Sequence, residues 1–188
     1  MRKKFIITAI ILLLIGVSAG IFGLFPVARV NGEFVLYRIY NERANALERF
    51  ETKNRLVAGS ESLTPAEQEE IRKFILQNLI AEHVFWQYVE EHTALSGLKE
   101  SADAVVAGTL KEADPNVLPQ ATKEIYGWSV DEFVENVLFW QAFQNELQKV
   151  IESDGTSFDE FARMQLNNAQ VQLYTVPWKW ENGGLSEK

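Results

Sequence analysis

The residue types that most often carry catalysis or bind metal are few in this chain. Its only histidines, His83 and His92, lie nine residues apart. On a helix this spacing is a rotation of about 900°, so the two rings point to opposite sides and cannot share a metal ion or a proton. The glutamate pairs at 69–70 and 90–91 are adjacent in sequence, so their carboxylates splay apart on a helix. The sequence therefore predicts neither a metal centre nor an acid–base pair.

Other common catalytic motifs are also missing from the sequence. It contains no cysteine, no glycine-rich phosphate loop, no G-x-S-x-G turn and no H-E-x-x-H helix. The chain carries 18 basic and 26 acidic side chains, which gives a net charge of −8. Proteins bind the phosphate backbone of nucleic acids with clusters of basic side chains, which a chain this acidic lacks. We therefore expect no enzyme activity, no cofactor and no nucleic-acid partner.

Five large aromatic side chains are the strongest candidates for binding. Phe85 and Trp86 lie in one helical stretch, and Phe139, Trp140 and Phe143 lie in another. Apolar rings that border a groove can bind extended polypeptides, while an acidic surface keeps such a protein soluble. Alternatively, the same rings fill the core between two long helices, as large aromatic side chains commonly do. Both placements remain open for each ring at this stage.

Two long helices have to position these rings. The first is predicted from Thr64 to Thr93, where Thr64 and Glu67 form a capping box around Pro65 at the first helical position. Its apolar residues form two rows, so this central helix needs packing partners on both sides. The rows consist of Ile71, Phe74, Ile75, Leu79, Phe85, Trp86 and Val89, and of Leu76, Ile80, Val84 and Tyr88.

The second long helix is predicted from Ser129 to about Asp154. Ser129 and Glu132 form another capping box, and Trp128 and Phe133 occupy the two positions of a hydrophobic staple. Apolar residues then recur three and four residues apart. We therefore expect this helix to pack lengthwise on the central helix.

Shorter elements account for the remaining sequence. A short strand at 27–30 runs into a turn at Asn31-Gly32, and the alternating residues of 170–176 predict a closing strand. Residues 179–188 are predicted to be a polar tail. The other predicted helices span 33–57, 98–113, 120–126 and 157–167.

The N-terminal residues predict a membrane segment. Phe5–Phe25 contains no charged residue and is long enough to cross a hydrocarbon core of about 30 Å. Small residues at 17–19 would suit a cleaved export signal, but the apolar run continues past them, which favours an uncleaved anchor. Three basic residues before Phe5 favour a cytoplasmic N-terminus and a single pass. Gly16 and Gly20 form a small-xxx-small pair that would permit a homodimer.

The order of several motifs resembles a known family. Val27-Ala28-Arg29-Val30-Asn31-Gly32-Glu33 precedes a helix, and Leu63-Thr64-Pro65 precedes the run from Ile71 to Glu82. Tyr126 to Phe133 begins a later helix, and Ala169 to Leu173 forms the closing strand. This order is similar to that of the N-terminal chaperone module of the SurA and PrsA families of extracytoplasmic foldases.

The resemblance covers about residues 26–176 and implies a mainly α fold with a small β element that pairs the first and last strands. These foldases usually carry a parvulin-type prolyl isomerase domain between the late helix and the closing strand. Here only Glu152 to Ala169 lies between them, which is too short for that domain. The resemblance thus implies a holdase-type chaperone without isomerase activity, whose partners are unfolded or extended exported polypeptides.

The predicted organisation has three parts. Residues 1–25 form the signal-anchor, residues 26–155 the helical chaperone module, and residues 156–188 a short helix, the closing strand and the tail. The bulk of the chain is expected outside the cell membrane, in the periplasm or at the cell surface. The alternative function is that of a structural or assembly subunit that binds one dedicated membrane-protein partner.

Overall fold

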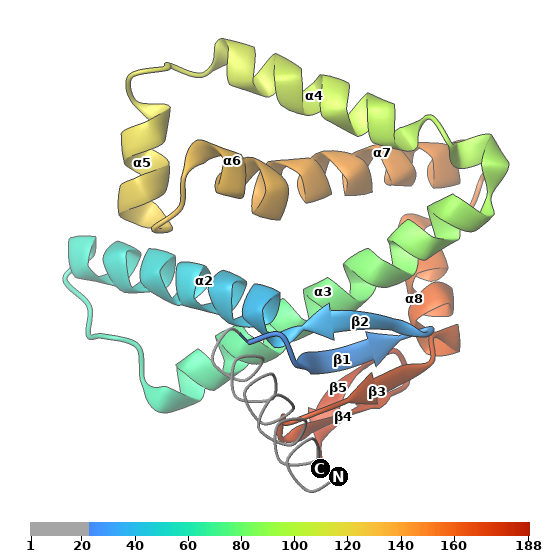
Figure 1. Cartoon of the computed structure of the whole chain (residues 1–188), viewed down its shortest axis with the longest axis horizontal. Helices are drawn as coiled ribbons and strands as arrows, with labels where there is room; N and C mark the ends of the chain where they lie inside the picture. The colour runs from blue at the N-terminus through green and yellow to red at the C-terminus, as the bar shows by residue number, and fades with distance from the viewer. Residues whose placement is uncertain (1–22) are drawn as a thin grey trace, which may run out of the picture.

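The computed structural model describes residues 23–188, which form a mainly helical body with two small antiparallel sheets (Figure 1). The mainly α class predicted from the sequence is confirmed. The strands are β1 (Pro26–Val30), β2 (Glu33–Leu36), β3 (Val171–Leu173), β4 (Trp178–Glu181) and β5 (Gly184–Glu187). The helical segments are α2 (Tyr37–Val57), α3 (Pro65–Glu91), η1 (Thr93–Leu95), α4 (Leu98–Glu112), α5 (Leu118–Ile125), α6 (Val130–Phe133), η2 (Val134–Leu138), α7 (Phe139–Ser153) and α8 (Phe158–Asn168).

The predicted membrane segment, Phe5–Phe25, lies outside the described residues except for its last three. Those three are not helical, and they lie against the start of α2. The carbonyl oxygens of Gly23 and Phe25 accept hydrogen bonds from the backbone N–H groups of Arg38 (3.0 Å) and Tyr37 (2.9 Å). They satisfy donors at a helix end that has no capping side chain. Within residues 23–188, no helix combines the length and the apolar character needed to cross a membrane.

The strand β1 is the middle strand of the larger sheet, in the order β2-β1-β3. It pairs antiparallel with β2 and also with β3, where Ala28 faces Leu173 and Val30 faces Val171. The predicted pairing of the first strand with the closing strand is therefore present. Val27, Ala28 and Val30 are fully shielded from solvent because β1 lies between two strands and also contacts α3.

The prediction of a helix from residue 33 was wrong for its first four residues. Asn31 and Gly32 both have positive φ, 48° and 103°, and turn the chain back into β2 before α2 begins at Tyr37. Val35 is buried while the neighbouring Phe34 is 56 % exposed, which is the alternation of a strand with one covered face. The asparagine–glycine turn therefore produces a hairpin where the helical periodicity suggested a longer helix.

Asn31 connects this turn to two distant elements. Its backbone N–H donates to the Gln170 carbonyl (2.9 Å), and the Gln170 N–H donates to the Asn31 Oδ1 (2.8 Å). Its Nδ2 donates to the Gln87 Oε1 on α3 (2.9 Å), and the Gln87 Nε2 donates to the Val30 carbonyl (3.3 Å). Asn31 thus fixes the residue before β3 and the middle of α3 relative to the same turn.

The helix α3 is the central helix, as predicted, and runs diagonally across the molecule (Figure 1). It begins with the predicted capping box, in which the Glu67 N–H donates to the Thr64 hydroxyl and the Glu67 carboxylate accepts from the Thr64 N–H. Phe74, which was predicted to pack, is instead 54 % exposed. The buried residues of α3 come from both predicted rows: Leu76, Leu79, Ile80, Val84, Phe85 and Val89.

Arginine side chains attach α2 to α3. Arg72 of α3 donates to the side chains of Asn41 (3.2 Å) and Asn45 (3.0 Å), and its Nε lies 2.8 Å from the Glu48 Oε1. These three partners are spaced about one helical turn apart along α2, so one guanidinium contacts successive turns of that helix. A polar seam therefore holds these two helices together.

The late helix begins where the sequence predicted. The Ser129 hydroxyl accepts from the Glu132 N–H (3.2 Å), and the Glu132 carboxylate accepts from the Ser129 N–H (2.7 Å), which confirms the capping box. The Tyr126 ring stacks on both predicted staple residues, at centroid distances of 5.7 Å from Trp128 and 5.3 Å from Phe133. The helix then passes through the π-helical turn η2 before it continues as α7.

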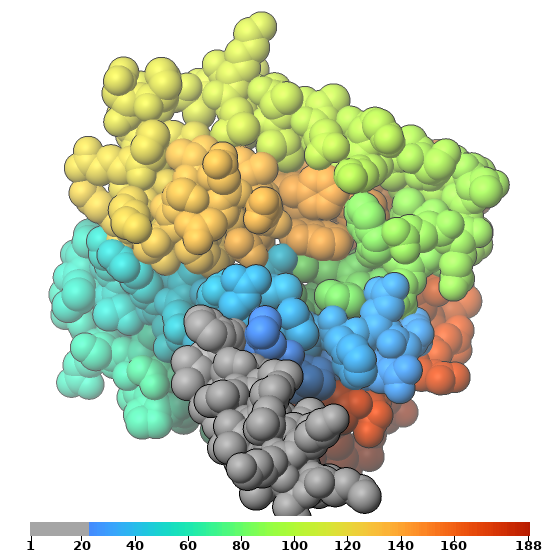
Figure 2. Space-filling model, viewed as in Figure 1, coloured from blue at the N-terminus to red at the C-terminus, as the bar shows by residue number. Residues whose placement is uncertain are grey.

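The prediction that the late helix packs lengthwise on the central helix was wrong, because α7 lies alongside α4 instead (Figure 1). The buried residues of both helices recur at spacings of about one turn, which lets ridges of side chains interdigitate. They are Leu98, Ala102 and Val106 on α4, and Ala142, Phe143, Leu147 and Ile151 on α7. Figure 2 shows α4, α5 and the late helix together above α2 and β2.

The prediction of a polar tail from residue 179 was also wrong, because the chain ends in the hairpin β4–β5. Its turn contains Asn182 and Gly183, both with positive φ, and Trp178 at its start is only 3 % exposed. The Gln77 side chain of α3 donates to the Gly183 carbonyl (3.1 Å) and accepts from the Leu185 N–H (2.9 Å). The hairpin is therefore a packed part of the fold.

The asparagines of the two hairpin turns provide a matched test of the Asn31 contacts. Asn31→Gly keeps the positive φ accessible but removes two side-chain hydrogen bonds. We expect the free energy of unfolding, measured by urea titration, to fall by about 1 kcal/mol or more. Asn182→Gly is the control, since Asn182 has almost the same φ of 49°. Equal stability of the two variants would contradict the proposed role of the Asn31 side chain.

Candidate functional site

Four of the five candidate aromatic side chains lie in one cluster between α3 and α7. The Trp86 ring of α3 lies 5.4 Å from Phe143, 5.9 Å from Trp140 and 6.2 Å from Phe139, measured between centroids. The Trp140 ring is also 5.5 Å from Phe139 and 5.7 Å from Phe143, in edge-to-face arrangements. Such arrangements stabilise aromatic pairs beyond simple burial. The cluster is therefore a wall of rings that come from two helices.

The fifth candidate, Phe85, faces a different part of the core. Its ring contacts Phe158 and Phe161 of α8, at centroid distances of 5.8 and 5.9 Å. Phe85 is 7 % exposed and Phe143 is 1 % exposed, so both are core residues over most of their surface. Trp86, Phe139 and Trp140 are only partly buried.

Two hollows lie on either side of Trp140, which lines both. The first has a volume of about 280 Å³ and the second about 390 Å³. The first is lined by Asn78, Ala81, Glu82, Phe85, Asn136, Val137, Trp140, Gln141, Phe143 and Gln144. The second is lined by Glu33, His83, Trp86, Lys99, Phe139 and Trp140. All five candidate rings thus border one hollow or the other.

The two histidines do not meet, as predicted from their spacing. The His83 Nδ1 lies 2.9 Å from the Leu79 carbonyl oxygen, and the ring borders the second hollow. The His92 Nδ1 lies 2.6 Å from the Tyr88 carbonyl oxygen, and the ring stacks on Tyr88 at 4.1 Å. Among residues 23–188 no three His, Asp or Glu side chains gather in a way that could hold a metal ion.

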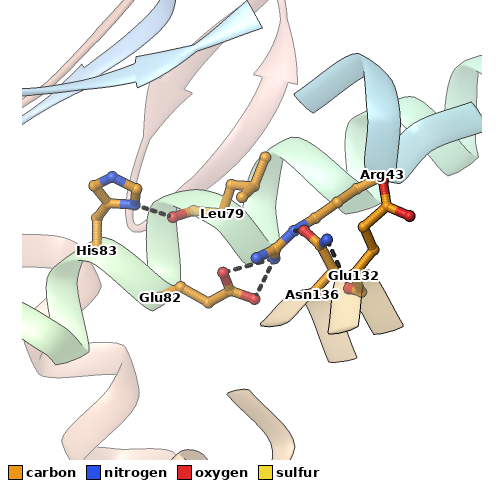
Figure 3. A network of polar contacts seen from close by, with 6 residues as sticks. All are labelled: Arg43, Leu79, Glu82, His83, Glu132 and Asn136. Carbon is orange, nitrogen blue, oxygen red and sulfur yellow. Dashed lines mark hydrogen bonds and ion pairs between the residues drawn. The ribbon is translucent and has the colours of Figure 1, made fainter. Parts of the chain in front are cut away.

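A buried ion pair beside the first hollow was not predicted from the sequence (Figure 3). The Arg43 Nη1 of α2 donates to both carboxylate oxygens of Glu82 on α3, each at 2.7 Å. The Arg43 Nε donates to the Asn136 Oδ1 in η2 (2.9 Å), and the Asn136 Nδ2 donates to the Glu132 carbonyl (2.8 Å). Arg43 therefore joins α2, α3 and the π-helical turn at one point.

One signal in the sequence could have revealed this pair. Glu82 lies three residues after Leu79 and three before Phe85, within the apolar side of the central helix. A carboxylate at such a position is rarely buried without a charged partner. Its partner Arg43 lies 39 residues away, and nothing local in the sequence links the two.

The surroundings of Glu82 change its affinity for protons. Burial raises the pKa of the Glu82 carboxyl from 4.5 to about 6, and the charge and hydrogen bonds of Arg43 limit the rise. The folded protein therefore binds this proton more tightly than the unfolded chain does. As a consequence, Glu82 lowers the free energy of unfolding as the pH rises from 4.5 to about 6.

Glu67, in the capping box of α3, acts in the opposite direction and at lower pH. Hydrogen bonds from Arg55 and from the Thr64 backbone and hydroxyl lower the pKa of the Glu67 carboxyl from 4.5 to about 2. Its contribution to stability is present above pH 4.5 and is lost as the pH falls toward 2. The pH ranges over which Glu67 and Glu82 change the free energy of unfolding therefore do not overlap.

Comparison of the chain with protein-family models, with curated proteins and with solved structures gives no significant match.

The Glu82 carboxyl is expected to dominate one part of the pH dependence of stability. Between pH 4.5 and about 6, the free energy of unfolding should fall by about 2 kcal/mol with rising pH through this group. Glu82→Gln removes the titrating group, so urea titrations across this range should give a flatter profile. Glu90→Gln, at an exposed position on the same helix, is the control. An unchanged slope in Glu82→Gln would refute the assignment.

Proposed function

We propose that this protein is a holdase-type chaperone that binds unfolded or extended polypeptides at the two hollows beside Trp140. The observation that carries this proposal is the cluster of partly exposed rings, Trp86, Phe139 and Trp140, which lines the second hollow and reaches the first through Trp140. Large rings held rigidly in a concave surface bind apolar side chains with little loss of conformational entropy. The order of sequence motifs that resembles the SurA and PrsA chaperone module supports the same function.

The charge of the protein suits this function. Its net charge of −8 limits association between copies while an apolar surface stays available to clients. The bases that line the hollows are few, namely Lys99 and His83. Client binding is therefore proposed to depend on apolar contact rather than on attraction between opposite charges. We propose no catalytic step, since the buried carboxylate beside the first hollow is held by Arg43.

We propose that the chain acts outside the cell membrane, attached by an uncleaved N-terminal anchor. The support is the sequence itself: residues 5–25 carry no charge, and three bases precede them. A chaperone attached there would meet polypeptides as they emerge from the export machinery.

The full chain should suppress the aggregation of an unrelated protein during heating, without ATP. Light scattering of the client should decrease as the chaperone is added, because unfolded segments bind at the hollows. Trp140→Ala, which changes the wall of both hollows, should require a concentration about fivefold or more higher for the same effect. Phe74→Ala, at an aromatic side chain that is 54 % exposed and outside both hollows, is the control and should act like the wild type.

Crosslinking in cells tests how many partners the protein has. Many exported proteins should be recovered with the wild type, and fewer with Trp140→Ala. Recovery of one or two stoichiometric partners, together with unaffected light scattering, would contradict the holdase and favour a subunit with a dedicated partner.

The proposed anchor and orientation can be tested directly. In membrane fractions the full chain should resist extraction by alkaline carbonate, because an uncleaved apolar segment remains in the bilayer. Protease added to the outer side should digest the region from residue 26 onward. A mature soluble form that begins near Gly20 would refute the anchor.

A further inference from the structure

The first hollow differs from the second in the chemistry of its walls. Four amide side chains line it, from Asn78 of α3, Asn136 of η2, and Gln141 and Gln144 of α7. Its apolar lining includes the rings of Phe85, Trp140 and Phe143. The second hollow has no amide side chain in its lining, which consists of the rings of Trp86, Phe139 and Trp140 together with Glu33, His83 and Lys99. The two hollows therefore offer different kinds of contact on either side of one tryptophan.

Three of the four amides are available to a ligand. The Asn136 side chain is committed to Arg43 and to the Glu132 carbonyl, whereas the side chains of Asn78, Gln141 and Gln144 form no hydrogen bond with another residue in the range 23–188. Each amide side chain offers two N–H donors and one carbonyl acceptor. A peptide bond offers one donor and one acceptor of the same kind. The hollow therefore matches the hydrogen-bonding groups of a polypeptide main chain.

The charge of the first hollow favours the same ligand. Glu82 is its only charged lining residue, and both of its carboxylate oxygens accept hydrogen bonds from Arg43. The wall is thus neutral and polar, which complements an uncharged main chain better than it complements lysine or glutamate side chains. Neutral amide contacts also do not depend on which side chains a client carries.

The two hollows share one lining residue, Trp140. In an extended chain the side chains project alternately to the two faces, while the N–H and C=O groups project sideways between them. A client side chain in the second hollow, beside Trp86 and Phe139, therefore lies next to a ring that also lines the first hollow. The arrangement separates recognition of one apolar side chain from recognition of the main chain.

We propose that Asn78, Gln141 and Gln144 bind the main-chain amides of an extended client whose apolar side chain occupies the hollow beside Trp86 and Phe139. This inference rests on the proposed holdase function and identifies the part of the client that the site binds. It explains how one site accepts many sequences: a single apolar residue anchors the client, and groups common to all polypeptides provide the remaining contacts.

The test uses the full chain and a fluorescent peptide with one central phenylalanine flanked by serine, glycine and alanine. A second peptide carries N-methyl groups on the residues next to the phenylalanine, which removes main-chain donors there. A third carries the same groups at its ends. Fluorescence anisotropy should give about three- to tenfold weaker binding for the second peptide only, as expected for the loss of one or two hydrogen bonds.

A glutamine variant assigns this loss to the first hollow. The double variant Gln141→Met/Gln144→Met should bind the unmethylated peptide more weakly than the wild type does. N-methylation should then lower the affinity by less than about twofold further, because the glutamine partners of the removed donors are already absent. Gln148→Met, one turn further along α7 and outside both hollows, should keep the full difference between the peptides.

The possible outcomes separate this inference from the function on which it rests. If the unmethylated and methylated peptides bind the wild type equally well, main-chain recognition is refuted while the holdase function stands. An equal methylation penalty in the wild type and the glutamine variant also refutes the role of these residues. If no peptide binds below about millimolar concentration, both proposals fail.

Discussion

The rest of the structure depends on the placement of β1 between two strands that come from opposite ends of the described chain. β1 pairs with β2 immediately after the Asn31-Gly32 turn, and with β3 across most of the sequence. A buried strand must have its backbone groups paired, so β1 cannot be covered until both neighbours are in place. Asn31 extends the constraint to α3 through Gln87. The central helix, the sheet and the C-terminal segment are therefore positioned together, and α2 is attached to this frame by its arginine contacts.

Polar contacts at buried positions determine how the helices are oriented. Apolar packing alone allows helices to slide, whereas Arg43 has partners in α3 and in η2 at defined distances. Burying such a pair costs desolvation energy that offsets much of the attraction between the charges, so the presence of the pair is by itself weak evidence that it stabilises the fold. The raised pKa of Glu82 reflects this cost. The same ion pair borders the first hollow, so the contact that orients the late helix also contributes to the shape of the candidate binding surface.

The sequence predicted local structure better than it predicted packing. The capping boxes at Thr64 and Ser129 are complete within four residues, so the helix starts could be recognised without knowledge of the fold. An apolar stripe shows that one face of a helix is buried but not which element covers it, and this is why α4 was missed as the partner of α7. The Asn182-Gly183 turn was missed although it repeats the asparagine–glycine signal of the first hairpin. The aromatic candidates came from the sequence, whereas their separation by Trp140 into two hollows depends on distant side chains.

The π-helical turn η2 has a consequence for insertions and deletions. A π turn contains one residue more than the α-helical turn it replaces, so it changes the rotational phase of everything that follows. Deleting one residue within Val134–Leu138 would remove the residue that the π turn adds, so the segment could close as an α-helical turn and α7 would keep its rotation relative to its capped start. An α-helical turn formed there at full length would instead rotate α7 by about 100° and turn Trp140 and Phe143 away from Trp86. This five-residue segment therefore tolerates the loss of one residue better than the conversion of its π turn to an α turn at full length.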